Sequence, residues 1–116
     1  MSPLERLNLD MARARFACDV VAFALGCEEN LLDQSRGSAA TALARQVAMY
    51  LAHVAFGMSL ARVATAFARD RSTAAHACHV IEDRRDDTRF DDLLDQLEAT
   101  LRAAPLPLPL ALKLAA

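Results

Sequence analysis

The chain has 116 residues, a formal net charge of −2 and a hydrophobic fraction of 54%. This length allows one domain with a modest core, and this composition excludes a chain that is disordered throughout. DNA-binding domains are usually basic, so the slightly acidic balance argues against nucleic acid unless the charges are segregated.

The cysteines and the N-terminus bear on the compartment. Cys18, Cys27 and Cys78 cannot all pair with one another and form no C-x-x-C, so we interpret them as reduced core thiols. The N-terminus lacks a basic region followed by an apolar run, and no apolar stretch reaches the roughly 18–20 residues that span a bilayer. We therefore expect a cytoplasmic protein with no signal peptide and no membrane contact.

The first predicted helix begins at Ser2-Pro3-Leu4-Glu5, where Ser2 can cap, Pro3 suits the first helical position and Glu5 completes a capping box. Gly26 suits its C-terminus. Its apolar residues recur at helical spacing: Leu4, Leu7, Met11, Cys18, Val21, Ala22 and Leu25. We expect a short helix over 28–33, and then a loop over 34–40 that carries one base, Arg36.

Three helices are predicted in the middle of the chain. Thr41 can cap a helix that runs to about Phe56 before Gly57. Ser59 can cap a shorter helix over 60–67. After a break near 68–69, Asp70 can cap a helix that runs to about Arg85.

The last predicted helix covers 89–103, with Thr88 as a candidate cap. Its inner face is rich in leucine, and its outer face is acidic: Asp91, Asp92, Asp95 and Glu98. The tail 105–116, PLPLPLALKLAA, has three alternating prolines, so it cannot begin as a helix and should be extended. Frequent alanine and few aromatics also favour closely packed helices over sheets. The predicted fold is thus all-α, with about six helices in one domain over 1–104 and a Pro-rich tail over 105–116.

The helices 59–67 and 70–85 have the spacing of a helix-turn-helix unit, whose core would be 59–85. If the 70–85 helix lies in a major groove, its first turn presents Asp70, Arg71, Ser72 and Thr73. Arg71 can donate two hydrogen bonds to guanine, Asp70 can accept from cytosine, and the Thr73 methyl can contact thymine. His76, one turn further on, can reach a base edge or a phosphate.

The charge distribution neither establishes nor excludes DNA binding by the helix 70–85. All of the basic residues except Lys113 are arginine, which suits phosphate and guanine but is also what a GC-rich genome encodes. Acid is concentrated in 82–95 and the last helix, away from the proposed reading end. The alternatives are a polar turn with a solvated helix cap, or a helix-turn-helix that serves only protein contact.

The segment 44–83, ARQVAMYLAHVAFGMSLARVATAFARDRSTAAHACHVIED, resembles the C-terminal helix-turn-helix domain of the bacterial replication initiator DnaA, its domain IV, which is similar to the Trp repressor. The matching pieces are the run 45–51, Ser59-Leu60, Phe67 and the run 69–77. The resemblance implies base reading by Asp70, Arg71, Ser72, Thr73 and His76. It also implies backbone contacts by Arg45, Ser59, Leu60 and Arg69, and we add Arg36 and Arg62 as phosphate contacts.

Departures from the family pattern predict a different target site. Arg71 replaces a family His, Ser72 replaces a Thr, Ala68 stands in place of a Gly pair, and Leu43 aligns with a minor-groove Arg for which Arg36 is the one substitute. The chain has no G-x-x-x-x-G-K-[ST] motif, so we expect no nucleotide binding and no self-sufficient initiator. It resembles instead the stand-alone DnaA-like proteins of alphaproteobacteria, and parts of regulators of gene transfer agents, which are phage-derived particles.

Other chemistry finds little support in the sequence. The histidines and cysteines form no four-ligand pattern, and no nucleophile is spaced from a base as in a catalytic pair. We therefore expect no enzyme, metal site or cofactor.

The predicted function is a sequence-specific, double-stranded-DNA-binding transcriptional regulator associated with the nucleoid, with phage-like or gene-transfer-agent genes as candidate targets. The alternatives are a replication accessory that binds initiator-type sites, and a protein-interaction adaptor. RNA polymerase or another regulator is a candidate partner, through the acidic helix 89–103 or the tail 105–116.

Overall fold

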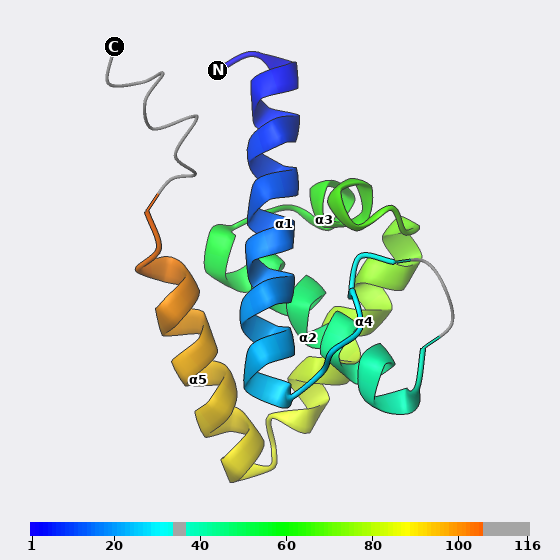
Figure 1. Cartoon of the computed structure of the whole chain (residues 1–116), viewed down its shortest axis with the longest axis vertical. Helices are drawn as coiled ribbons and strands as arrows, with labels where there is room; N and C mark the ends of the chain where they lie inside the picture. Colours follow the sequence, from blue (N-terminus) through cyan, green and yellow to red (C-terminus); the bar gives the residue numbers. More distant parts are fainter. Residues whose placement is uncertain (34–36, 106–116) are drawn as a thin grey trace.

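The computed structural model describes residues 1–33 and 37–105, which form five helices and no strand (Figure 1). These helices are α1 (Pro3–Leu25), α2 (Ala39–Phe56), α3 (Leu60–Phe67), α4 (Arg71–Arg84) and α5 (Thr88–Arg102). The all-α prediction is confirmed. The expected sixth helix over 28–33 is wrong, because that segment is a bend and a turn. The tail expected to be extended falls on 106–116, outside the described residues.

The helix ends follow local capping rules, with two corrections to the expected caps. Ser2 Oγ accepts a hydrogen bond from the Glu5 N–H at 3.1 Å, as the capping box predicts. Ser38, not Thr41, caps α2: its hydroxyl accepts from the Thr41 N–H at 3.2 Å, while Thr41 itself is buried. Asp87, not Thr88, caps α5, because a carboxylate accepts from both the Arg89 and Phe90 N–H groups.

Helix α2 is the centre of the fold and packs against α1, α4 and α5. Six consecutive residues of α2, from Val47 to Ala52, are buried, so this helix faces neighbours on most of its surface. The core also includes Val21, Val63, Phe67, Ile81, Leu94 and Leu101. Fully buried Ala14, Ala17, Ala44, Ala48 and Ala52 let the helix backbones approach closely. Each large core side chain contributes about 1.5–3 kcal/mol through burial.

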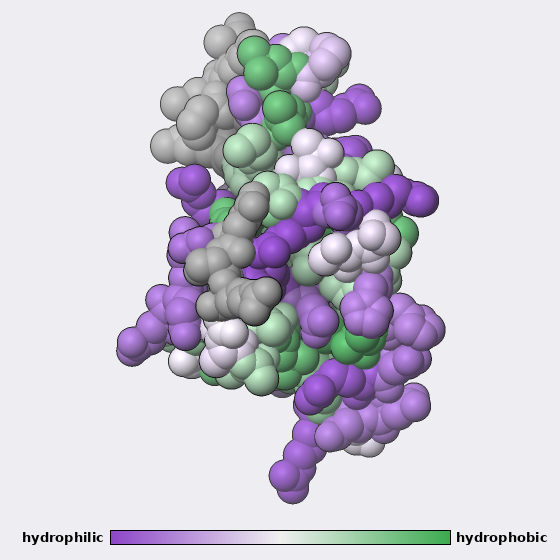
Figure 2. Space-filling model, turned by 90° about the vertical axis from the view of Figure 1, so that its right-hand side faces the viewer, coloured by the Kyte–Doolittle hydropathy of each residue, from purple (hydrophilic) through white to green (hydrophobic). Residues whose placement is uncertain are grey.

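Helix α1 is only partly covered by the rest of the molecule. Its C-terminal half enters the core through Cys18 and Val21. Its N-terminal half extends past α3, so Leu4 and Met11 of the predicted stripe are exposed (Figure 1). Figure 2 shows the resulting hydrophobic surface on the projecting part of the helix.

The three cysteines are free thiols. Burial raises the pKa of Cys18 to about 12 and that of Cys78 to about 11, so both stay protonated at neutral pH. This agrees with their interpretation as unreactive packing residues. None of the helices in the described residues is long and apolar enough to cross a bilayer.

Candidate nucleic-acid interface

Helices α3 and α4 form the predicted helix-turn-helix unit. Ser59 caps α3 through a hydrogen bond from the Arg62 N–H at 3.2 Å. The apolar face of α3 buries Val63 and Phe67, and α4 packs against the same core through Ala74, Ala77 and Ile81. The position of α4 is therefore set by burial of one face, which leaves the other face for solvent or a ligand.

Ala68 makes the turn between these helices. It has φ 54° and ψ 45°, the left-handed conformation that glycine adopts more readily. Among the described residues it is the one non-glycine residue with positive φ. Its N–H caps the last carbonyls of α3, and the chain then redirects into α4. A single left-handed residue thus does what the Gly pair does in the family pattern.

The N-terminal end of α4 presents a polar surface with no internal role. Arg71, Ser72, Thr73 and His76 are all exposed. None of their side chains forms a hydrogen bond or an ion pair within the part of the chain that the structure describes. Asp70 occupies the N-cap position with extended backbone, but its carboxylate makes no capping hydrogen bond. The five predicted base-reading residues therefore share one end of one helix, and their polar atoms are available.

Arg45 and Arg69 meet beside this end of the unit. Arg45 Nε donates to the Leu31 carbonyl at 2.9 Å, and Arg45 Nη2 donates to the Asp33 carbonyl at 3.2 Å. Arg69 Nη2 donates to the same Asp33 carbonyl at 3.1 Å. Burial and the nearby Arg69 charge both lower the pKa of Arg45.

This arginine pair is incompletely satisfied. Arg69 Nε is buried and has no hydrogen-bond partner among the described residues. Both guanidinium groups donate to backbone carbonyls, and the nearby Asp33 charge partly offsets the lowering of the Arg45 pKa. Two neighbouring guanidinium groups that share one carbonyl acceptor favour an anion such as a phosphate.

Arg62, a predicted phosphate contact, has an internal partner. Its Nε donates to Asp10 Oδ2 at 2.9 Å and its Nη2 to Asp10 Oδ1 at 2.5 Å. The Asp10 side chain is 5% exposed, so this two-pronged pair ties α1 to α3. The guanidinium retains an exposed edge, but its principal contacts are structural.

The remaining predicted contacts are Ser59, which is exposed, and Leu60, which begins α3 and is half-buried. Arg36 lies outside the described residues.

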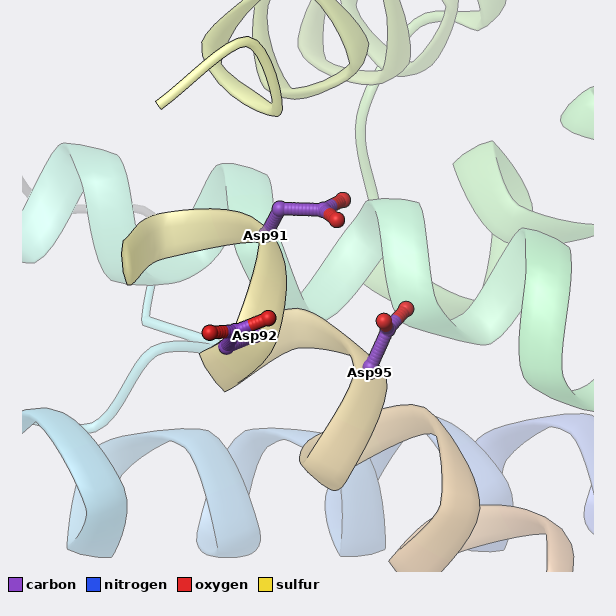
Figure 3. Close-up of side chains that lie close together, drawn as sticks. All are labelled: Asp91, Asp92 and Asp95. Carbon is purple, nitrogen blue, oxygen red and sulfur yellow. The ribbon is translucent and has the colours of Figure 1, made fainter. Parts of the chain in front are cut away.

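Acidic side chains gather at the opposite end of α4. Asp91, Asp92 and Asp95 place carboxylate oxygens within 4.8 Å of one another on α5 (Figure 3). Arg85 compensates this charge: it donates to Asp91 at 2.5 Å and also pairs with Asp95. Asp91 and Asp95 are thus part of an ion-pair network with Arg85, and Asp92 places a third carboxylate beside them.

A model of the bacterial dnaA protein helix-turn-helix matches residues 17–81 of this chain. The chain belongs to this family. Its matched segment includes α2, α3 and most of α4, so it contains most of the helix-turn-helix unit and the arginine pair. Membership of the family implies DNA binding.

A crystal structure of a DNA replication initiation factor is similar to this chain, with a TM-score of 0.73 and 29% sequence identity. The match covers 85% of this chain and 31% of that factor, so this chain spans less than a third of the factor's length. A search of curated protein sequences gives no match. The family and the fold likeness together establish a DnaA-like helix-turn-helix protein.

Sequence reasoning missed two features of this interface. Asp10 lies 52 residues before Arg62, and no local pattern shows that an acid on the first helix is buried against the helix-turn-helix unit. The shared Asp33 carbonyl is a backbone acceptor, so no side chain reports it. The absence of an acid close to an arginine in the sequence therefore does not tell whether that arginine has an internal partner or is available to a ligand.

Proposed function

We propose that this protein binds double-stranded DNA sequence-specifically, with the N-terminal end of α4 in the major groove. The observation that carries the proposal is the exposed set of polar side chains at that end, which form no hydrogen bond or ion pair among residues 1–33 and 37–105. Polar groups with several donors and acceptors that satisfy nothing inside the protein are suited to base edges.

Each residue has a role that follows from its chemistry. Arg71 donates two hydrogen bonds to guanine O6 and N7, and Asp70 accepts from a cytosine amino group. Ser72 and Thr73 contact a base edge or a thymine methyl, and His76 reads the next position along α4. The free N–H groups of the first turn of α4 add favourable contacts to a phosphate.

The arginine pair supplies the non-specific part of binding. Arg45 and Arg69 hold a backbone phosphate beside the groove, together with the N-terminus of α3 at Ser59 and Leu60. Arg36 extends this contact, and Arg62 adds to it through its exposed edge while it remains paired with Asp10. Because the whole chain is slightly acidic, we expect weaker long-range attraction than in a basic domain, but the usual fall in affinity with salt.

For the biological role we propose transcriptional regulation, including control of phage-like or gene-transfer-agent genes. The similarity to a DNA replication initiation factor favours a second candidate, a replication accessory that occupies initiator-type sites. A contact with RNA polymerase through the acidic face of α5 belongs to the first candidate. An adaptor that contacts protein alone is the competitor to both.

Genome-wide occupancy of the tagged protein, compared with Arg71→Ala, tests the proposal. Sharp promoter-proximal peaks that disappear in the variant would support a regulator and supply its motif. Peaks at the replication origin would instead support the replication accessory. Peaks identical in the two proteins would contradict base reading by Arg71, and no peaks in either would favour the adaptor.

A further inference from the structure

An apolar groove of about 540 Å³ lies between α1, the C-terminal end of α2 and the C-terminal end of α5. Helices α1 and α5 lie side by side and frame it (Figure 1). Its apolar lining consists of Ala12, Phe16, Ala55, Phe56, Leu101 and Ala104, and Pro105 closes one side. Its volume is in the range of pockets that hold a small ligand or part of a peptide.

Two aromatic rings and two arginines define the chemistry of this groove. Phe16 is 38% exposed, although Ala17 and Cys18, which follow it on α1, belong to the core. The Arg13 guanidinium lies 5.2 Å from the centre of the Phe56 ring. On the other side, Arg102 Nη2 donates to the Val54 carbonyl and Arg102 Nη1 pairs with Glu98 at 2.8 Å.

Aromatic floors with donors at the rim are the usual receptors for proline-rich segments. Such segments adopt the polyproline II conformation without internal hydrogen bonds, so their carbonyls are free to accept from side-chain donors. Little conformational entropy is lost when they bind, because the conformation exists beforehand. The groove therefore fits a short Pro-Leu sequence better than it fits a helix.

The chain itself supplies such a sequence at the edge of the groove. Pro105 is a wall residue, and the residues that follow it are LPLPLALKLAA, with leucine at every second position from 106 to 114 and one charge, Lys113. A segment tethered at the groove has a high effective concentration there, which favours it over a separate molecule. Five residues in the polyproline II conformation span about 15 Å.

We propose that residues 106–110, LPLPL, dock in the α1–α2–α5 groove of their own chain. The prolines and leucines cover Phe16 and Phe56, and the backbone carbonyls accept from Arg13 and Arg102. Docking joins the end of α5 to the middle of α1, which otherwise share few contacts. The groove involves no residue of the α4 reading end, so this contact is independent of DNA binding.

The test is photo-crosslinking in the full-length chain, with p-benzoylphenylalanine in place of Phe16. Irradiation followed by proteolysis and mass spectrometry should give an intrachain crosslink from position 16 to the 105–116 peptide. The matched control places the same residue at Phe23, which is 91% exposed on the same helix but outside the groove. A tail that collides with the surface at random would label both positions alike, and that outcome would overturn the proposal.

Two further results would decide the occupant. The triple variant L106N/L108N/L110N should lower the crosslink yield at position 16 to that at position 23, with an unchanged helical signal in circular dichroism and unchanged DNA affinity. A crosslink that joins two chains would instead assign the groove to a second copy. Persistence of the intrachain crosslink in the triple variant would contradict recognition of the leucines.

Discussion

The two ends of α4 both carry arginines, and the structure uses them in opposite ways. At the C-terminal end Arg85 is held by Tyr50, Asp91, Asp95 and Glu98, with a side chain only 16% exposed. At the N-terminal end Arg71 is exposed and has no partner within the described ranges. An arginine surrounded by acids stabilises the fold, whereas one that projects from a helix end without an acid is available to a ligand.

The chemistry around Arg85 shows how completely one end is satisfied. Tyr50 donates to Glu82 at 2.6 Å and accepts from Arg85 at 3.1 Å. Burial lowers the pKa of Arg85, but its hydrogen bonds to Asp91 and Tyr50 outweigh this and raise the pKa above its ordinary value. The acidic surface of α5 is thus largely an internal partner of α4. Arg62, held by Asp10, belongs to the same structural class as Arg85.

The largest effect is expected for Arg62→Met. Removal of the guanidinium leaves the Asp10 carboxylate buried without its partner, which should lower the free energy of unfolding by about 3 kcal/mol. Urea denaturation measures this change. The double variant D10N/R62M should recover part of the lost free energy of unfolding. If Arg62→Met were as stable as the parent, Arg62 would belong with the arginines that are proposed to bind DNA.

Arg85→Met should lower the free energy of unfolding by about 2 kcal/mol, because several charge-assisted hydrogen bonds are lost and neighbouring acids then repel one another. Arg84→Met is the control, since this neighbour is exposed and its guanidinium lies over the Phe90 ring. We expect a change below about 1 kcal/mol for it. Equal losses of unfolding free energy for the two variants would contradict the stabilising role assigned to Arg85, and with it the contrast between the ends of α4.

Arg71→Ala should leave stability unchanged and weaken binding to the preferred duplex by about 10- to 100-fold, as loss of a bidentate base contact does. Fluorescence anisotropy with the preferred and a scrambled duplex measures both affinities. Binding to the scrambled duplex should change little. A loss of the same size on both duplexes would make Arg71 a phosphate contact rather than a reader of sequence.

Arg69→Gln should weaken binding to all duplexes alike and reduce the slope of log affinity against log salt by about one. Arg15→Gln is the matched control, because Arg15 is an exposed arginine on α1 that has no assigned role in DNA contact. Titrations at several salt concentrations supply the slopes. A slope unchanged by Arg69→Gln would show that the arginine pair supports the fold alone.

The smallest effect is expected for Ala68→Gly in the turn between α3 and α4. Glycine relieves the left-handed strain but increases the freedom of the unfolded chain, so we expect a gain in stability of about 0.5 kcal/mol. Thermal unfolding detects a shift of this size. A gain in stability with reduced DNA affinity would show that the strained turn holds the reading end in position.

The five helices, their approximate ends and the grouping of the predicted base-reading residues could all be predicted from the sequence. These features are local: caps, apolar spacing and the first turn of one helix need only neighbours along the chain. The misassigned caps at Thr41 and Thr88 lie three residues and one residue from the true caps, and the missing helix over 28–33 was too short to form without packing to support it. The run 69–77, together with the run 45–51, Ser59-Leu60 and Phe67, also suggested the family.

The tertiary structure alone decided which arginines are free. Arg62 and Arg71 look alike in sequence, as basic residues near the starts of two neighbouring helices. Only the fold brings Asp10 to Arg62 across 52 residues, whereas Arg71 forms no ion pair among the described residues. The partner of a charge is set by distance in space, which local sequence does not encode, and so the division between arginines held inside the fold and exposed arginines had to come from packing.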